Sequence, residues 1–225
     1  MSSGRSFKRG PAEYRRGRLK FPSSGKAFLV VTEGINTEPS YLRGLRDRLQ
    51  LNVAEVIVVH PNGTDPITLT NKAIELRDER KKQAKKGDAI AFDEVWVVFD
   101  LEKAHDQRRE IAQKAMSMND AKGIQFAVSD PCFEYWLLLH FEYTARPFTD
   151  CSSVIKVLKR HCPNYHKGQD HLELIESLPA AVMNAQRCRK HHNDAGGDGN
   201  PTTSVDLLAK SLNAATRVHL QFPLT

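Results

Sequence analysis

The stretch AFLVVTE, residues 27–33, is a continuous apolar run that ends in a glutamate. Such a run is typical of a strand that is buried on both faces of a parallel sheet. A second run, EVWVVFD at residues 94–100, ends in an aspartate in the same way. Because a carboxylate at the end of a buried strand is costly without a partner, we expect Glu33 and Asp100 to converge. Their meeting point is then the carboxyl edge of the sheet, where open α/β sheets bind their ligands.

Strands and helices alternate along the first part of the chain. Further apolar runs predict strands at 53–60 and 124–129. Helical periodicity predicts three helices: one that begins at Thr37, one that ends near Lys86, and one at 105–122. The order β-α-β-α-β-α-β indicates a four-stranded parallel sheet with helices on both faces.

After the fourth strand the pattern predicts only helices, at 131–143, 152–160, 170–189 and 205–217, with a Gly-rich loop at 193–201. We therefore predict an α/β fold that consists of a parallel sheet flanked by helices, with a helical C-terminal extension. The predicted divisions are an arm at 1–26, an α/β core at 27–147 and a helical part of the same domain at 148–225.

The positive charge is concentrated at the N-terminus. The net charge is +6, and residues 1–26 hold eight Lys and Arg against one Glu, so the rest of the chain is close to neutral. A basic arm favours contact with nucleic acid, and Arg15, Arg16 and Arg18 are its candidate substrate contacts. The alternative is a disordered, solvated leader.

Two long motifs resemble those of a known family. Residues 31–41, VTEGINTEPSY, and residues 129–141, SDPCFEYWLLLHF, are similar to the two signatures of RloB-like proteins. Weaker matches are YHK at 165–167 and NPTT at 200–203. This family is linked to restriction and abortive-infection loci in bacteria and to phage defence. The resemblance implies a core similar to the Toprim fold of topoisomerases, primases and OLD-type nucleases.

Toprim proteins place a glutamate after the first strand and a D-x-D motif after the third, and bind Mg²⁺ (or Mn²⁺) between them. Glu33 matches the first position and Asp100 the first acid of D-x-D, whereas Glu102 stands in place of the second Asp. The resemblance thus implies Glu33, Asp100 and Glu102 as metal ligands and catalytic residues. The alternative is that Glu33 and Glu102 cap or flank turns without a metal.

The second motif adds a fourth candidate catalytic acid, Glu134, on a helix that is apolar all round. Such a helix is buried, so Glu134 needs a partner. It either faces the metal site or bonds to a neighbouring backbone or basic group. Lys167 is a candidate phosphate contact, with an exposed lysine as the alternative. Glu38 fits a first-turn acid that the helix dipole favours.

The four cysteines are scattered, and we expect no disulfide framework. The spacings of Cys162 with His166, and of Cys188 with His191, leave a zinc site as a minor alternative to ordinary core cysteines.

These features predict a Mg²⁺-dependent nuclease that acts as an effector in phage defence. The alternative is a non-catalytic subunit that binds nucleic acid or an ATPase encoded nearby, and nucleotidyl chemistry on a small nucleotide is a third possibility. No apolar run approaches the ~20 residues of a membrane span, and no secretory signal is recognisable. We therefore expect a cytoplasmic protein without membrane contact, and its helical faces are compatible with a homodimer.

Overall fold

The computed structural model describes residues 26–51, 56–59, 65–102, 106–168, 172–196, 199–216 and 220–221. Nearly all of the predicted basic arm lies outside these ranges, including Arg15, Arg16 and Arg18, as do parts of the predicted strand at 53–60 and loop at 193–201. In the described parts of the chain, no helix has the length and apolar character that a membrane span requires.

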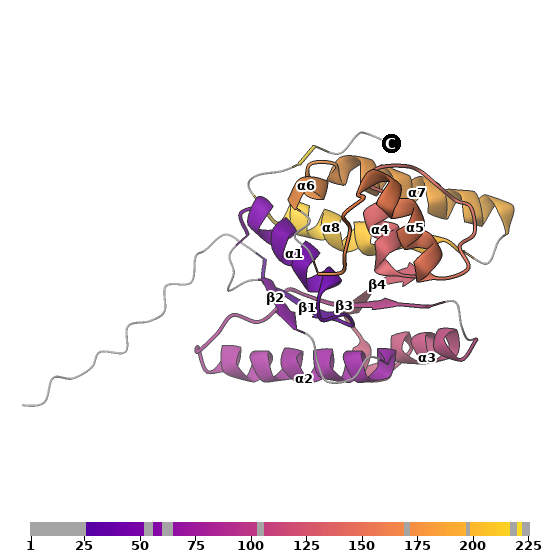
Figure 1. Cartoon of the computed structure of the whole chain (residues 1–225). Coiled ribbons are helices and arrows are strands. Elements are labelled where there is room, and N and C mark those ends of the chain that lie inside the picture. Colours follow the sequence, from indigo (N-terminus) through magenta and orange to yellow (C-terminus); the bar gives the residue numbers. More distant parts are fainter. Residues whose placement is uncertain are drawn as a thin grey trace, which may run out of the picture.

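One sheet of the order β2-β1-β3-β4-β5 forms the centre of the fold (Figure 1). Its first four strands pair in parallel: β1 (Phe28–Thr32), β2 (Val56–Val59), β3 (Glu94–Asp100) and β4 (Ile124–Asp130). The predicted four-stranded parallel sheet is thereby confirmed. A fifth strand, β5 (Thr202–Thr203), pairs antiparallel with β4 and was not predicted, because two residues are too short to show a period.

Helices cover both faces of the sheet, as predicted (Figure 1). One face carries α2 (Pro66–Lys85) and α3 (Asp106–Met116), followed by a short 3₁₀ helix, η1 (Asn119–Ala121). The other face carries α1 (Thr37–Arg48), α4 (Phe133–Leu138), α5 (Cys151–His161), α6 (Leu172–Ile175), α7 (Leu178–Ala195) and α8 (Val205–Ala214).

The apolar strands supply the cores on both faces. Phe28 and Val30 of β1 join the core beneath α1 and the C-terminal helices, whereas Leu29 and Val31 join the core beneath α2 and α3. This alternation follows from the two-residue period of a strand. The helices after β4 therefore complete the core on one face of the sheet.

Two predicted helices differ from the structure. The helix expected at 131–143 spans only Phe133–Leu138, because the amides of His140 and Phe141 bond to carbonyls three residues back and tighten the chain into turns. The helix expected at 170–189 is divided into α6 and α7. Pro179 stands in the first turn of α7, where a proline is tolerated, whereas it would break the interior of a continuous helix.

A disulfide joins Cys132 and Cys151, although the scattered cysteines predicted no disulfide framework. The bond links the residue before α4 to the first residue of α5. A separation of 19 residues gives no sign of this pairing in the sequence; it arises because α4 packs against α5. Cys162 and Cys188 are free thiols.

Candidate active site

A cavity of about 430 Å³ lies at the carboxyl edge of the sheet. Its charged lining consists of five carboxylates and one ammonium group: Glu33, Glu38, Asp100, Glu102, Glu134 and Lys167. The remaining wall consists of Gly34, Ile35 and Asn36 in the loop between β1 and α1, Thr37 at the start of α1, and Phe133 of α4. The four acids singled out from the sequence thus share one cavity with Lys167.

Glu33 directly follows β1 and is tied to the end of β3, its neighbour in the sheet. Its Oε2 accepts a hydrogen bond from the Asp100 amide at 3.0 Å. Its Oε1 pairs with Nη2 of Arg108 at 2.5 Å, and Arg108 Nε donates to the Asp100 carbonyl at 2.7 Å. Arg108 thereby fixes the Glu33 carboxylate, although each carboxylate oxygen has a second lone pair for another ligand.

Asp100, the last residue of β3, lines the cavity with an incompletely hydrogen-bonded carboxyl group. Within the part of the chain that the structure describes, its buried Oδ1 has no hydrogen-bond partner. Burial raises the pKa of Asp100 well above its ordinary value, and the charges of Glu38, Glu33 and Glu134 raise it further, against a lowering by the Phe133 amide. Because a buried polar oxygen without a partner is costly, Oδ1 is the atom best placed to receive a cation or a proton.

Glu38 also faces the cavity, a position that the sequence did not predict. It lies in the first turn of α1, as expected, but is only 6% exposed. Its Oε1 accepts from the Gly34 amide at 3.1 Å. Burial raises its pKa, and the charges of Glu134 and Glu33 add to that rise, although hydrogen bonds from backbone amides lower it. Only a glycine leaves room here, since a Cβ at position 34 would lie 1.9 Å from Glu38 Oε2.

Glu102 lies on the exposed side of the cavity, two residues beyond Asp100. Its φ of 35° is in the left-handed region, which residues other than glycine rarely adopt. The Glu102 amide donates to the Pro131 carbonyl at 3.0 Å, so the end of β3 stays attached to the segment after β4. Strained backbone of this kind clusters at functional sites.

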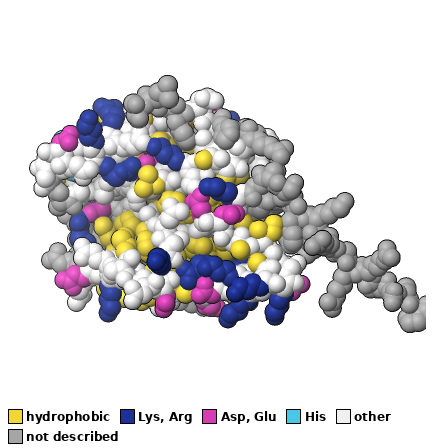
Figure 2. All heavy atoms as spheres, turned by 180° about the vertical axis from the view of Figure 1, so that it is seen from behind, with side chains coloured by type: hydrophobic (Ala, Val, Ile, Leu, Met, Phe, Trp, Pro, Cys, Tyr) yellow, Lys and Arg dark blue, Asp and Glu magenta, His cyan; other side chains and the backbone are white. Residues whose placement is uncertain are grey.

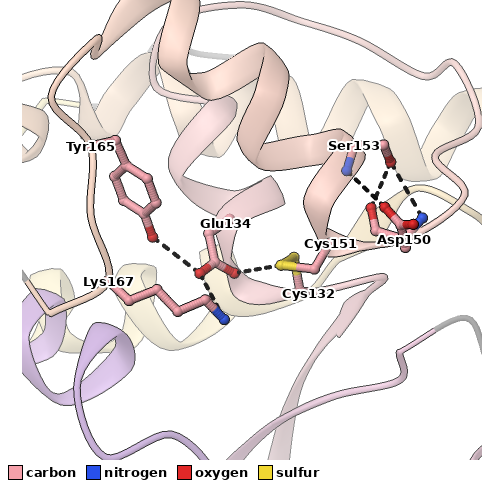
Figure 3. The surroundings of a disulfide bond; sticks show 7 residues. All are labelled: Cys132, Glu134, Asp150, Cys151, Ser153, Tyr165 and Lys167. Carbon is pink, nitrogen blue, oxygen red and sulfur yellow. Dashed lines mark hydrogen bonds and ion pairs between the residues drawn. A yellow bond between two sulfur atoms is a disulfide. The ribbon is translucent and has the colours of Figure 1, made fainter.

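Glu134 is 2% exposed. Its Oε1 has two polar partners, and its Oε2 contacts a sulfur of the disulfide (Figure 3). The Tyr165 hydroxyl donates to Oε1 at 3.0 Å, and Lys167 Nζ lies 3.4 Å from the same oxygen. Oε2 lies 3.1 Å from Sγ of Cys151. Glu134 therefore lines the acidic cavity and pairs with a basic residue, whereas its contribution to a metal site stays a prediction.

The predicted metal ligands do not form a preassembled coordination sphere. Among the described residues, the one trio with donor atoms within 4.8 Å of one another is Cys132, Glu134 and Cys151. Glu33, Asp100 and Glu102 line one cavity but form no such trio among the described residues.

The alternative zinc ligands are not brought together in the described structure. Cys162, His166, Cys188 and His191 form no such cluster among the residues described. Cys188 is buried, and its Sγ lies 3.0 Å from both the Tyr135 hydroxyl and the Pro201 carbonyl. It is therefore part of the core, as expected for an ordinary buried cysteine.

The basic helix α2 lies on the opposite face of the sheet from α1 and α4. Figure 2 shows Lys and Arg side chains in the lower layer of the molecule, interspersed with Asp and Glu. Lys72 pairs with Glu75, and Arg77 pairs with Asp78. This mixture is typical of a solvated helix face and does not form a uniformly basic surface.

Arg108 is a site residue that sequence reasoning missed. Its only sign in the sequence is a pair of arginines at 108 and 109 after the acids of β3, and such pairs are common on exposed helices. The second arginine forms an ion pair with the buried Asp130 at the end of β4. Both arginines thus neutralise acids at the carboxyl edge of the sheet.

A model of RloB-like proteins matches residues 28–212 of the chain. The matched range is more than half of the sequence and includes every residue that lines the cavity. No curated protein and no solved structure matches the chain.

Proposed function

The chain belongs to the RloB-like protein family, and from this premise we propose that it is a Mg²⁺-dependent nuclease of the Toprim type, an effector of phage defence. The observation that supports the proposal most strongly is the buried Oδ1 of Asp100, which has no hydrogen-bond partner among the described residues and belongs to a residue that lines a cavity with four further carboxylates. Hard divalent cations prefer oxygen ligands of this kind.

The cavity has the donor set that a magnesium ion requires. Asp100 would be the direct ligand, and Glu33 and Glu102 would hold the ion through direct or water-mediated contacts. The ion would supply positive charge to polarise the phosphate and to stabilise the leaving oxygen. Manganese accepts the same ligands and serves as a spectroscopic substitute.

The charge of the cavity makes substrate binding dependent on a cation. Five carboxylates face one lysine, so the metal-free cavity repels a phosphodiester. Burial and mutual repulsion raise the pKa of both Asp100 and Glu38. Glu38 and Asp100 therefore hold a proton more readily than exposed carboxyl groups do.

The test is a cleavage assay with labelled DNA and RNA, single- and double-stranded, in the presence of Mg²⁺ or Mn²⁺. Wild-type protein is expected to cleave one class of substrate, and Glu33→Gln and Asp100→Ala are expected to lose at least about a hundredfold in rate. Asp88→Ala, which changes an exposed acid far from the cavity lining, is the matched control. Equal cleavage by all four proteins would contradict the assignment, and incubation with nucleoside triphosphates would detect nucleotidyl transfer instead.

Lys167→Ala is expected to weaken nucleic-acid binding without removing cation binding. The Lys167 side chain is 61% exposed at the cavity, and its Nζ lies 3.4 Å from Glu134 Oε1, so its ammonium group can also reach a phosphate. Losing one phosphate contact lowers the slope of log affinity against log salt by about one. The measurement is a salt titration of binding in Mn²⁺, with Lys156→Ala as the control because Lys156 is an exposed residue on α5. An unchanged slope would show that Lys167 does not contact a phosphate and is an ordinary surface residue.

One observation favours a non-catalytic alternative, in which the chain binds nucleic acid or an ATPase partner. Both oxygens of Glu33 are already engaged, by Arg108 and by the Asp100 amide, and Glu102 replaces the second Asp of D-x-D. An intact fold that binds no cation and shows no metal-stimulated activity, but co-purifies with a stoichiometric ATPase, would support this alternative.

A further inference from the structure

The disulfide between Cys132 and Cys151 contacts Glu134 (Figure 3). Glu134 in turn lines the acidic cavity. Cys132 precedes Glu134 by two residues, and the sulfur of Cys151 lies 3.1 Å from Oε2 of Glu134. The other oxygen of Glu134 is held by Tyr165 and Lys167. Oε2 is thus in contact with Cys151 Sγ, and the chemical state of this sulfur determines whether it can donate a hydrogen bond to Oε2.

We propose that Cys132 and Cys151 form a reversible oxidation site whose state sets the hydrogen bonding of Glu134. The inference deepens the proposed function and, in its effect on cation binding, rests on it. In the oxidation step, the two thiols lose two electrons and two protons as the S–S bond forms. The acceptor is a peroxide, which becomes water and an alcohol or two waters, or a low-molecular-weight disulfide, which becomes two thiols. A thiol reductant reverses the step.

The two states differ in the proton available to Glu134. In the disulfide, Cys151 has no proton to donate, so the lone pairs of Oε2 stay available to a cation or to water. In the dithiol, the Cys151 thiol can donate to Oε2 at the observed separation, and it then competes with a cation for this oxygen. We therefore expect the disulfide form to bind a hard cation more tightly than the dithiol form.

The site is both accessible and fixed in position. Cys132 is 1% exposed, whereas Cys151 is half-buried and can be reached by a small reductant or oxidant. Asp150 and Ser153 form a capping box at the start of α5, which holds Cys151 in place (Figure 3). In a reducing compartment, a disulfide with these properties is more often redox-sensing than structural.

The first test is the equilibrium between the disulfide and the dithiol in a series of glutathione buffers, measured by mass-tagging of free thiols. Glu134→Gln is expected to shift this equilibrium about tenfold toward the disulfide, because it removes a charge-assisted thiol–carboxylate hydrogen bond from the dithiol form. The control is Glu142→Gln, a change to an acid that pairs with His161 instead. A shift of less than about twofold in Glu134→Gln would overturn the inference.

A second variant guards against a folding defect in Glu134→Gln. Tyr165→Phe removes a donor from Oε1 and leaves the carboxylate more dependent on the Cys151 thiol. It is expected to move the equilibrium in the opposite direction, toward the dithiol. The same direction of shift in both variants would contradict the proposed hydrogen bond.

The second readout is Mn²⁺ affinity, measured from the electron paramagnetic resonance signal of the free ion. The disulfide form is expected to bind Mn²⁺ about tenfold more tightly than the dithiol form, which corresponds to about 1.4 kcal/mol. Cys151→Ser, which keeps a donor, should resemble the dithiol, and Cys151→Ala should resemble the disulfide. Equal affinity in the two states would overturn the coupling. If neither state binds Mn²⁺, the proposed metal-dependent function fails. The glutathione series then still tests whether Glu134 sets the equilibrium between the disulfide and the dithiol.

Discussion

Asp100→Asn is expected to raise the melting temperature of the metal-free protein above the raised pKa of Asp100 and to abolish its stabilisation by Mg²⁺. The substitution removes a buried charge that faces Glu38, Glu33 and Glu134 but keeps an oxygen that can accept from the Phe133 amide. Removing the cost of such a buried, unpaired group stabilises the folded protein by about 1–3 kcal/mol. For a chain of this length, this corresponds to an increase of about 2–12 °C.

The gain in stability should depend on pH in a defined direction. Folding raises the pKa of Asp100 above its ordinary value of 3.8, so the folded protein binds the proton more tightly than the unfolded chain. The contribution of this proton to stability is complete below pH 3.8 and is lost as the pH rises through the raised pKa. Wild type and Asp100→Asn should therefore converge in stability at acidic pH and diverge as the pH rises through the raised pKa of Asp100.

Thermal melts in a chelator across this pH range, with and without added Mg²⁺, measure both effects. Asp88→Asn is the control, because it changes an exposed acid. A variant that melts below the wild type at pH values above the raised pKa of Asp100, or that is still stabilised by Mg²⁺, would show that Asp100 has a structural role without cation binding.

Gly34→Ala is expected to expel Glu38 from its place in the cavity. The added Cβ would lie 1.9 Å from Oε2 and 2.5 Å from Cδ of Glu38, so the carboxylate has to move and loses its bond from the Gly34 amide. Overpacking of this kind costs about 1–3 kcal/mol. If Glu38 contributes to the electrostatic attraction of the cation, Mn²⁺ affinity should fall by about tenfold, the effect of about 1.4 kcal/mol.

A double-mutant cycle of Gly34→Ala with Glu38→Ala separates the steric clash with Glu38 from other effects of the alanine at position 34. Truncation of Glu38 removes the clash, so Gly34→Ala should cost much less stability in the Glu38→Ala background than in the wild type. The cycle is measured by denaturant unfolding and by Mn²⁺ titration. Additive costs in the two backgrounds would show that Gly34 is not required for the position of Glu38.

The site could be predicted from sequence where it depends on the sheet. Glu33 and Asp100 end neighbouring parallel strands, so the strand pattern alone placed them at one edge. The second motif indicated Glu134, and a three-residue match indicated Lys167. Glu38 could not be placed in the cavity, because its position depends on how the chain turns back at Gly34 and not on any periodicity.

The parts of the fold that escaped prediction depend on contacts between distant segments. Strand β5 exists because Thr202 and Thr203 meet the end of β4, and two residues show no period of their own. The disulfide depends on the packing of α4 against α5, and Arg108 depends on the direction in which α3 leaves the sheet. Each of these contacts is decided by tertiary structure, which local propensity does not specify.

The most direct test of the account is the anomalous scattering of Mn²⁺ in crystals of the wild-type protein. We expect a peak in the cavity within about 2.0–2.6 Å of a carboxylate oxygen of Asp100, the range of hard-cation contacts in proteins, and no such peak in crystals of Asp100→Asn. At saturating Mn²⁺, an empty cavity, or a peak only at sites remote from Glu33, Asp100 and Glu102, would contradict the proposal of a metal-dependent active site.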